Sequence, residues 1–300
     1  MYLFSNEEED SITSELSQIS DSLRGWNLKK RYDRLKALNI SNLSSTFCIT
    51  DRKLYQIYKG INFGTSVDMI IGSSIHSIVE KIFESVLFAN NGNFGIDAFL
   101  DKIKDEKMLE QFIWNGGRLQ ELRNLSADER EFQTKLENMK TAMRNIVDLE
   151  MTRVGDSSLN SRAKILDLER YVSGESMQIS NGKIDAILTF NEKIGLGDLK
   201  TGRPWKDNKD AKLQITIYAL LLEAEIKREI DWGVVIFPYD TLNGTKKLRV
   251  TPLKDVFGIG DELRSEALTR LQSVNEMLHR ENPPEVCYRC RTRDICSVVA

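Results

Sequence analysis

The sequence predicts a mixed α/β domain in which a small sheet, formed by the second half of the chain, is surrounded by helices. Two observations lead to this prediction. Between residues 164 and 200, apolar and polar residues alternate with a period of two, in short runs separated by Gly, Ser and Asn. On either side of these runs, the apolar residues repeat at helical spacing. Such a pattern favours helices packed against a sheet.

The first half of the chain is predicted to be mainly helical. Residues 1–40 are expected to form an N-terminal helical extension, and residues 41–300 the main domain. An apolar helix is predicted over residues 67–88, and a helical insertion over about residues 90–155.

The second half of the chain supplies the predicted sheet. Short strands are expected at residues 164–172, 177–179, 183–190, 195–200, 232–238 and 247–250. Helices are expected at residues 207–227 and 256–280. The second of these ends just before Pro283 and Pro284, which cannot continue a helix.

Bulk composition restricts the class of protein. The net charge of the 300 residues is −3, so any contact with nucleic acid must come from local basic patches. No apolar run approaches the ~20 residues that cross a bilayer, which argues against a membrane protein. The N-terminus also lacks the basic start and apolar core of a signal peptide. A cytoplasmic location is therefore expected, and thiols stay reduced there.

The four cysteines form an unusual set. Three stand near the C-terminal end as C-x2-C-x5-C, at Cys287, Cys290 and Cys296, and the fourth is Cys48. Four thiolates are the usual complement of a structural zinc or an iron–sulfur cluster, and a shared site would join the two ends of the chain. The spacing favours a cluster, because a zinc ribbon usually has two C-x2-C pairs. Zinc is the alternative. Residues 281–300 are thus predicted to bind the cluster.

Two successive predicted strands carry acidic residues. Asp185 lies in the first, and Asp198-Leu199-Lys200 in the second. If these strands form a hairpin, the two carboxylates lie side by side, with Asp198 and Lys200 on one face and Leu199 on the other. Two carboxylates beside an ammonium are typical of a magnesium or manganese site that acts on a phosphate. The alternative is a pair of surface aspartates in an ordinary salt bridge.

Four further polar residues are candidates for the same site. Gln214 and Tyr218 are four residues apart on a predicted helix and share one of its faces. Glu169 lies on the predicted strand before the acidic pair, and His76 lies on the predicted apolar helix. A single histidine on a helix is often structural, so this assignment depends on its neighbours.

The polar residues occur in an order that resembles a known family. The order is a histidine, a glutamate, G-x-x-D, D-x-K-T-G and Q-x-x-x-Y, at His76, Glu169, 182–185, 198–202 and 214–218. It resembles the RecB-like branch of the PD-(D/E)XK nucleases. With the four cysteines added, the chain resembles a narrower group, the iron–sulfur exonucleases of CRISPR adaptation, which are the fourth family of Cas proteins.

A second stretch supports the same resemblance. Residues 43–48, Leu-Ser-Ser-Thr-Phe-Cys, followed by Arg52 and Leu54-Tyr55, are similar to the first cysteine motif of that family. The resemblance extends over roughly residues 43–296 and leaves residues 1–40 outside. The family often has Glu where this chain has Asp198, and the broader superfamily accepts either.

The resemblance implies a RecB-like nuclease core and a role for each matched residue. The catalytic magnesium or manganese would be held by His76, Asp185, Asp198 and the backbone carbonyl of Leu199. Catalysis would involve Lys200 as the catalytic lysine, Glu169 as the upstream carboxylate, and Gln214 and Tyr218, which would hold the DNA or the lysine. A [4Fe–4S] cluster would be bound by Cys48, Cys287, Cys290 and Cys296 and would join the N- and C-terminal regions.

A short basic stretch follows the acidic strands. Arg203 and Lys206 flank Trp205, and positive charges beside an aromatic ring suit single-stranded DNA. Alternatively, this is an exposed loop whose charges are offset by Asp207 and Asp210.

These observations predict a metal-dependent DNA exonuclease that acts on single strands or overhangs. The resemblance implies that it processes DNA before spacer integration in CRISPR adaptation, with the integrase proteins as partners. The alternatives are a nuclease of recombination, repair or viral replication, a weakly catalytic DNA-binding assembly subunit, and a zinc-containing protein with an incidental D-x-K. The chain has no G-x-x-x-x-G-K-[ST] loop, which argues against a helicase motor.

Overall fold

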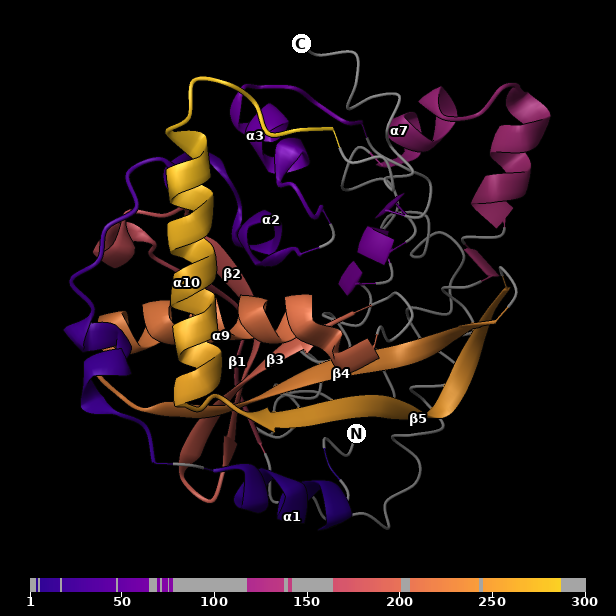
Figure 1. The fold of residues 1–300 in the computed structure, drawn as a ribbon. Coiled ribbons are helices and arrows are strands. Elements are labelled where there is room, and N and C mark those ends of the chain that lie inside the picture. The colour runs from indigo at the N-terminus through magenta and orange to yellow at the C-terminus, as the bar shows by residue number, and fades with distance from the viewer. Residues whose placement is uncertain are drawn as a thin grey trace.

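The structure of the chain is a computed structural model. It describes residues 4, 6–16, 18–46, 48–64, 69–70, 72–74, 76–77, 118–137, 140–141, 164–200, 206–242 and 245–286. Within these residues, five strands form one sheet and helices pack against it (Figure 1). The prediction of a small mixed sheet flanked by helices is confirmed.

The sheet follows the order of the chain, β1-β2-β3-β4-β5. Its strands are β1 (Lys164–Val172), β2 (Gly182–Phe190), β3 (Lys193–Leu199), β4 (Ile230–Leu242) and β5 (Thr245–Gly258). All neighbours are antiparallel except β3 and β4, which are parallel because the helix between them carries the chain back across the sheet. The β2–β3 hairpin therefore brings the beginning of β2 beside the end of β3.

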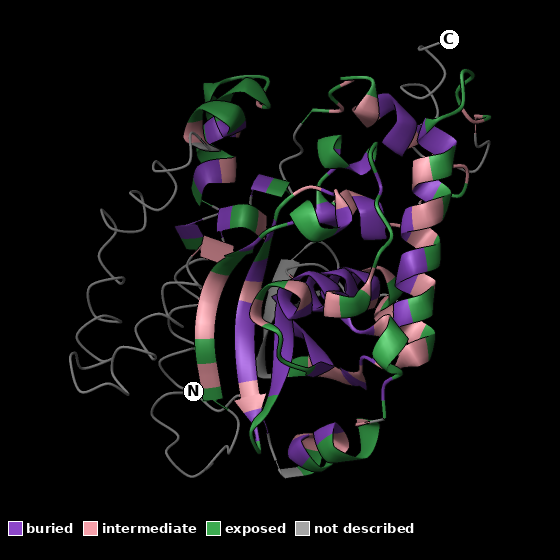
Figure 2. Ribbon diagram, turned by 90° about the vertical axis from the view of Figure 1, so that its left-hand side faces the viewer, coloured by how far each residue is buried: buried purple, intermediate pink, exposed green. Residues whose placement is uncertain are grey.

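Two long helices cover one part of this sheet in successive layers. Helix α9 (Lys209–Ile226) lies against the strands, and α10 (Asp261–Leu278) crosses over α9 (Figure 1). Most of α9 is buried, as Figure 2 shows, because it lies between the sheet, α10 and the short helix α2 (Ile40–Ser44). A helix that is apolar on most of its circumference suits such an enclosed position.

The N-terminal segment is less helical than expected. Helix α1 (Asn6–Glu15) packs on β5, and three short turns of 3₁₀ helix follow, η1 (Asp21–Leu23), η2 (Gly25–Asn27) and η3 (Leu35–Ala37). The segment bends because its residues are drawn into the core. A Cβ on Gly25 would overlap the backbone of Leu220, so the turn at Gly25 lies directly on α9.

A buried network of charges fixes this segment in place. Glu223 of α9 accepts hydrogen bonds from Arg264 at 2.8 and 2.9 Å and from Arg24 at 2.9 Å. Arg24 also donates to Asp231 at 2.8 Å. Buried charges are tolerated only when they are paired, so removing one partner would leave another uncompensated. The network ties the N-terminal segment to α9, α10 and β4.

Some predicted elements differ in the structure. Residues 177–179 are not a strand, because the chain forms a 3₁₀ turn, η4 (Glu175–Met177), and buries Met177 and Ile179. Residues 256–258 complete β5 rather than beginning the last helix. The described part of the predicted insertion contains helix α7 (Arg118–Asn124) and a second helical stretch at residues 129–137. Residues 90–117, 138–139 and 142–155 of the insertion lie outside the described part of the chain.

Crossing a membrane requires a helix that is both long and apolar. None of the described helices combines these two properties.

Candidate active site

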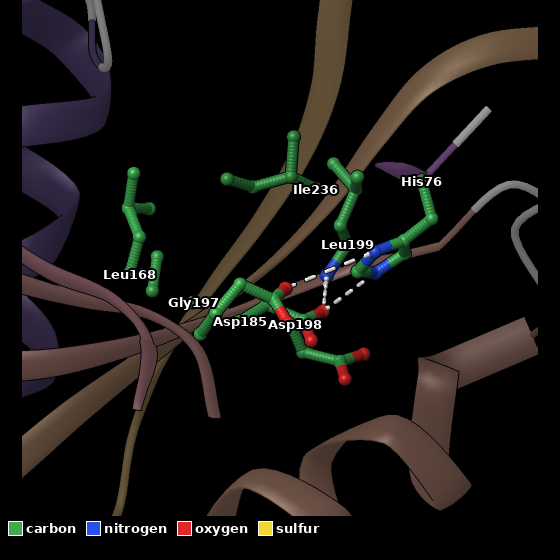
Figure 3. Close-up of a pocket in the computed structure, with 9 residues that line it drawn as sticks. His76, Leu168, Asp185, Gly197, Asp198, Leu199 and Ile236 are labelled. Carbon is green, nitrogen blue, oxygen red and sulfur yellow. Dashed lines mark hydrogen bonds and ion pairs between the residues drawn. The ribbon is translucent and has the colours of Figure 1, made fainter. Parts of the chain in front are cut away.

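The β2–β3 hairpin brings two carboxylates together. Ala186 pairs with Gly197 in the antiparallel register, so Asp185 and Asp198 lie beside each other. The backbone N–H of Leu199 donates to Oδ2 of Asp185 at 2.7 Å (Figure 3). This bond holds the Asp185 carboxylate at the end of β3, in the position that the hairpin prediction requires.

His76 and Glu169 complete a group of three possible ligands. Nε2 of His76 lies 3.1 Å from Oδ2 of Asp185 (Figure 3). Its Nδ1 lies 4.0 Å from Oε1 of Glu169. One ligand atom from each of the three residues lies within 4.8 Å of the others. Two carboxylates and an imidazole converging in this way fit a divalent cation.

Asp198 occupies a different environment. It is only 4% exposed, and its Oδ1 accepts a hydrogen bond from Nε2 of Gln214 at 3.1 Å. Burial raises the pKa of Asp198 to about 6; the charge of Asp185 adds to this rise, and the ammonium of Lys200 opposes it. The carboxylate is therefore held in an environment where a neighbouring positive charge would favour its ionised form.

Lys200 is held by two partners. Its Nζ lies 2.8 Å from Oδ2 of Asp198 and donates to Oε1 of Gln214 at 3.0 Å. A third of its side chain remains exposed, so the ammonium is both fixed in place and accessible. Gln214 thus orients both residues: its Oε1 accepts from Lys200, and its Nε2 donates to Asp198.

Tyr218 lies one turn of α9 beyond Gln214 and is buried. Burial raises its pKa to about 12, with contributions from the charges of Asp198 and Asp185. Its ring packs against Gly182, where an added Cβ would overlap both the ring and the side chain of Ile40. The glycine of the G-x-x-D motif therefore allows the tyrosine to approach the beginning of β2.

Glu169 has an unusual backbone. Its φ is +53°, in the left-handed region, and it follows a register shift between Ile165 and Asp167 of β1. Residues other than glycine rarely adopt this conformation, and such strain is frequent at functional sites. The bend turns the Glu169 carboxylate toward His76, which local sequence patterns could not predict.

Lys183 was not among the residues predicted from the sequence. Its ammonium contacts Oε2 of Glu169. The sequence does contain a signal for Lys183, because residues two apart on a strand share a face and Lys183 precedes Asp185 by two. Exposed lysines are common on strands, however, so this spacing alone does not indicate a site.

A small pocket lies at His76, Glu169, Asp185 and Asp198 (Figure 3). Besides the polar residues, it is lined by Leu168, Ala186, Gly197, Leu199 and Ile236. Its apolar lining reduces the access of water to the carboxylates and strengthens the electrostatic interactions at the site.

The loop that carries Cys48 is fixed at several points. Arg270 donates to both carboxylate oxygens of Asp51 at 2.7 Å. It also donates to the carbonyl oxygens of Leu43 and Ser45. Cys48 itself is partly buried and free. Arg270 therefore fixes the chain on both sides of Cys48.

The C-terminal segment runs beside this loop. Helix α3 (Arg52–Tyr58) begins four residues after Cys48, and Arg52 donates to the carbonyl oxygen of Pro284 at 2.6 Å. Four extended residues span at most about 14 Å. Because Cys287 is only three residues beyond Pro284, this contact is compatible with a site shared by both ends of the chain. Cys287, Cys290 and Cys296 lie outside the described residues.

Of the three predicted DNA-binding residues, the structure describes only Lys206, and of Lys206 only the backbone. Arg203 and Trp205 lie outside the described residues, and for Lys206 the structure describes the backbone, in η5 (Lys206–Asn208). The nearby Asp210 accepts hydrogen bonds from the backbone and hydroxyl of Thr46 at 2.9 and 2.5 Å. Asp210 therefore links the first turn of α9 to the Cys48 loop.

Two of the solved structures that are similar to this chain share little sequence with it. A solved structure of a proposed exonuclease from Eubacterium rectale is 12% identical over 95% of this chain and 94% of its own, with a TM-score of 0.45. The protein SSO0001 is 18% identical over 69% of this chain and 96% of its own, with a TM-score of 0.28. Similarity at this level assigns no activity. No curated protein matches the chain.

The family comparison is more specific. The model of one family, described as CRISPR-associated exonuclease Csa1, matches residues 9–298, which is nearly the whole chain. The residues of the candidate site lie within that range. The chain belongs to the family of CRISPR-associated exonuclease Csa1.

Proposed function

We propose that this protein is a metal-dependent DNA exonuclease with a PD-(D/E)XK core that trims single strands or overhangs before their integration into a CRISPR array. The observation that carries the proposal is the placement of Asp185 and Asp198 beside Lys200, with His76 and Glu169 completing the donor set. Carboxylates and one lysine in this arrangement suit hydrolysis of a phosphodiester.

Magnesium or manganese would be held by His76, Asp185 and Asp198, with the carbonyl of Leu199 as a further ligand. Glu169 joins this set, because its carboxylate lies 4.0 Å from His76. When bound, the cation would lower the pKa of a water molecule and offset negative charge on the phosphate.

The protein's own side chains orient the ammonium of Lys200. Asp198 and Gln214 fix the ammonium of Lys200, which faces the substrate without first having to be ordered. From this position Lys200 stabilises the charge that develops on the phosphate oxygens. Tyr218, whose pKa is raised to about 12, keeps its proton at neutral pH and supports the face of α9 that carries Gln214.

The DNA would extend from this site over the segment that follows Lys200. Arg203 and Lys206 would contact phosphates, and Trp205 would stack on a base. Membership of a CRISPR-associated exonuclease family supports a role in spacer acquisition, with the integrase proteins as partners.

Cys48, Cys287, Cys290 and Cys296 would bind a [4Fe–4S] cluster that joins the two ends of the chain. The support is the hydrogen bond from Arg52 to Pro284, which holds the segment before Cys287 against the helix after Cys48. Protein purified without oxygen would be brown with a cluster and colourless with zinc.

The test is anaerobic incubation with end-labelled single-stranded, overhanging and blunt DNA, with magnesium, manganese or a chelator. Wild type should cut only with metal, and Lys200→Ala should be inactive. Lys164→Ala, which changes an exposed lysine at the start of β1, is the matched control and should cut normally. A wild type that binds DNA with its cluster intact but does not cut would contradict the proposal and favour an assembly subunit.

A further inference from the structure

The edge of the sheet beside the active site carries an exposed aromatic ring. Tyr171 of β1 is 72% exposed, although a large aromatic side chain usually gains free energy by burial. In the antiparallel register it pairs with Lys183 of β2. Directly opposed residues share a face of the sheet, with Cβ atoms about 5 Å apart. The two side chains therefore leave the same face of the sheet at neighbouring positions.

This pair faces the same side of the hairpin as the catalytic carboxylates. Lys183 contacts the carboxylate of Glu169. Asp185, two residues further along β2, lies on the same face about 7 Å away. The Tyr171–Lys183 pair is thus the first exposed pair of residues outside the active site in this direction.

The position is also accessible. β1 is the last strand of the described sheet on this side, and its residues are partly exposed while those of β2 are mostly buried (Figure 2). A nucleic acid strand could therefore approach the hairpin along β1. Single exposed apolar residues are common on proteins. What distinguishes Tyr171 is its register with a lysine that touches a catalytic carboxylate.

We propose that Tyr171 stacks on an unpaired base of the substrate and that Lys183 contacts the adjoining phosphate, next to the phosphodiester that is cut. The inference rests on the proposed nuclease function and adds a substrate-binding platform to it. An ammonium has three N–H donors, so contact with Glu169 leaves others for phosphate oxygens. A tyrosine ring stacks on any base, and only on one that is unpaired.

Binding in chelator, where no cutting occurs, tests the platform. Fluorescence anisotropy would measure the affinity of the cluster-containing protein for labelled single strands and blunt duplexes. Tyr171→Ala should weaken single-strand binding about 5- to 150-fold, the range expected for the loss of one stacked base. Blunt-duplex binding should not change. Tyr171→Phe, which keeps the ring, should bind single strands like wild type.

Leu166→Ala is the matched control, because Leu166 is 48% exposed on the same strand and should not contribute. Lys183→Met should reduce the slope of log affinity against log salt by about 0.7, the value for one contact with a single-stranded phosphate. A strand carrying 2-aminopurine at successive positions should show quenching at one position near its end. That signal should disappear in Tyr171→Ala and persist in Tyr171→Phe.

The inference is overturned if Tyr171→Ala binds single strands like wild type, if it weakens duplex binding equally, or if Leu166→Ala causes the same loss. Tyr171→Gln provides a second exposed substitution, and thermal melting checks that each variant is folded. If wild type cuts normally and Tyr171→Ala binds single strands like wild type, only this inference is overturned. If wild type binds single strands through Tyr171 but does not cut them, only the nuclease proposal is overturned. If wild type binds no single strands, both proposals are overturned.

Discussion

Arg52 and Pro284 are joined by a hydrogen bond between opposite ends of the chain. Nη1 of Arg52 donates to the carbonyl oxygen of Pro284 at 2.6 Å. On the same helix, the hydroxyl of Tyr55 donates to the carbonyl oxygen of Glu281 at 3.2 Å. The segment after α10 is thereby held beside the helix that follows Cys48.

Replacing Arg52 should loosen this contact. In Arg52→Leu, we expect less iron per chain after anaerobic purification and faster loss of iron to a chelator, since a hydrogen bond from a charged donor contributes about 1.5 to 3 kcal/mol. Iron content and visible absorbance measure the effect. Arg280→Leu, an exposed arginine just beyond α10, is the control. Equal iron retention in both variants would show that the contact does not support the cluster.

Gln214 should matter for turnover more than for DNA binding. In Gln214→Met, Lys200 and Asp198 each lose a hydrogen-bond partner. Hydrogen bonds to charged groups contribute about 1.5 to 3 kcal/mol, so we expect kcat to fall about 10- to 150-fold. Single-turnover cleavage would measure the rate, and anisotropy in chelator the affinity. Gln133→Met, on a surface helix, should leave both unchanged, and an unaffected kcat in Gln214→Met would exclude this role.

Stability without metal should depend on the titration of Asp198. Its pKa in the folded protein is raised to about 6, mainly by burial, above the ordinary 3.8. The folded state therefore binds more protons between these values, and wild-type stability falls as pH rises from about 4 to 6. Relative to Asp198→Asn, which does not titrate, wild type should lose about 2 to 3 kcal/mol across this window.

Urea unfolding in chelator at pH 4 and at pH 7 measures this difference. Asp167→Asn, which changes a half-exposed carboxylate on β1, is the control and should follow wild type at both pH values. A constant difference between wild type and Asp198→Asn would mean that Asp198 has an ordinary pKa.

Gly182→Ala should disturb both stability and activity. The added Cβ would overlap the ring of Tyr218 and the side chain of Ile40, and overpacking typically costs about 1 to 3 kcal/mol. Because Asp185 is three residues further along β2, we expect cleavage to fall as well. Thermal melting and cleavage assays measure the two effects. Ser173→Ala, at an exposed position after β1, should leave both intact. A Gly182→Ala protein with the stability of wild type would show that the ring of Tyr218 can move aside.

The strands were predictable because their signal is local. Alternation of apolar and polar residues gave the bounds of β1, and the hairpin that it implied brings Asp185 beside Asp198. The shared helix face of Gln214 and Tyr218 was likewise predictable, because their spacing of four residues is a local feature of the sequence. Gln214 indeed contacts Lys200.

The N-terminal segment was harder to predict for a physical reason. Its composition suits a helix, but Arg24 finds its partners in Glu223 and Asp231, about two hundred residues away in sequence. Such long-range ion pairs outweigh helix propensity, which amounts to less than 1 kcal/mol for most residues. The chain bends into 3₁₀ turns to reach them.

The sequence alone predicted most of the strands along the chain, the acidic hairpin, and a family resemblance that the family comparison confirmed. Tertiary structure decided which distant side chains meet there. His76 reaches Asp185 across 109 residues, and the left-handed backbone of Glu169 turns its carboxylate toward His76 and Lys183. Periodicity reports only on neighbours along the chain, whereas these contacts depend on packing between elements that are far apart in sequence.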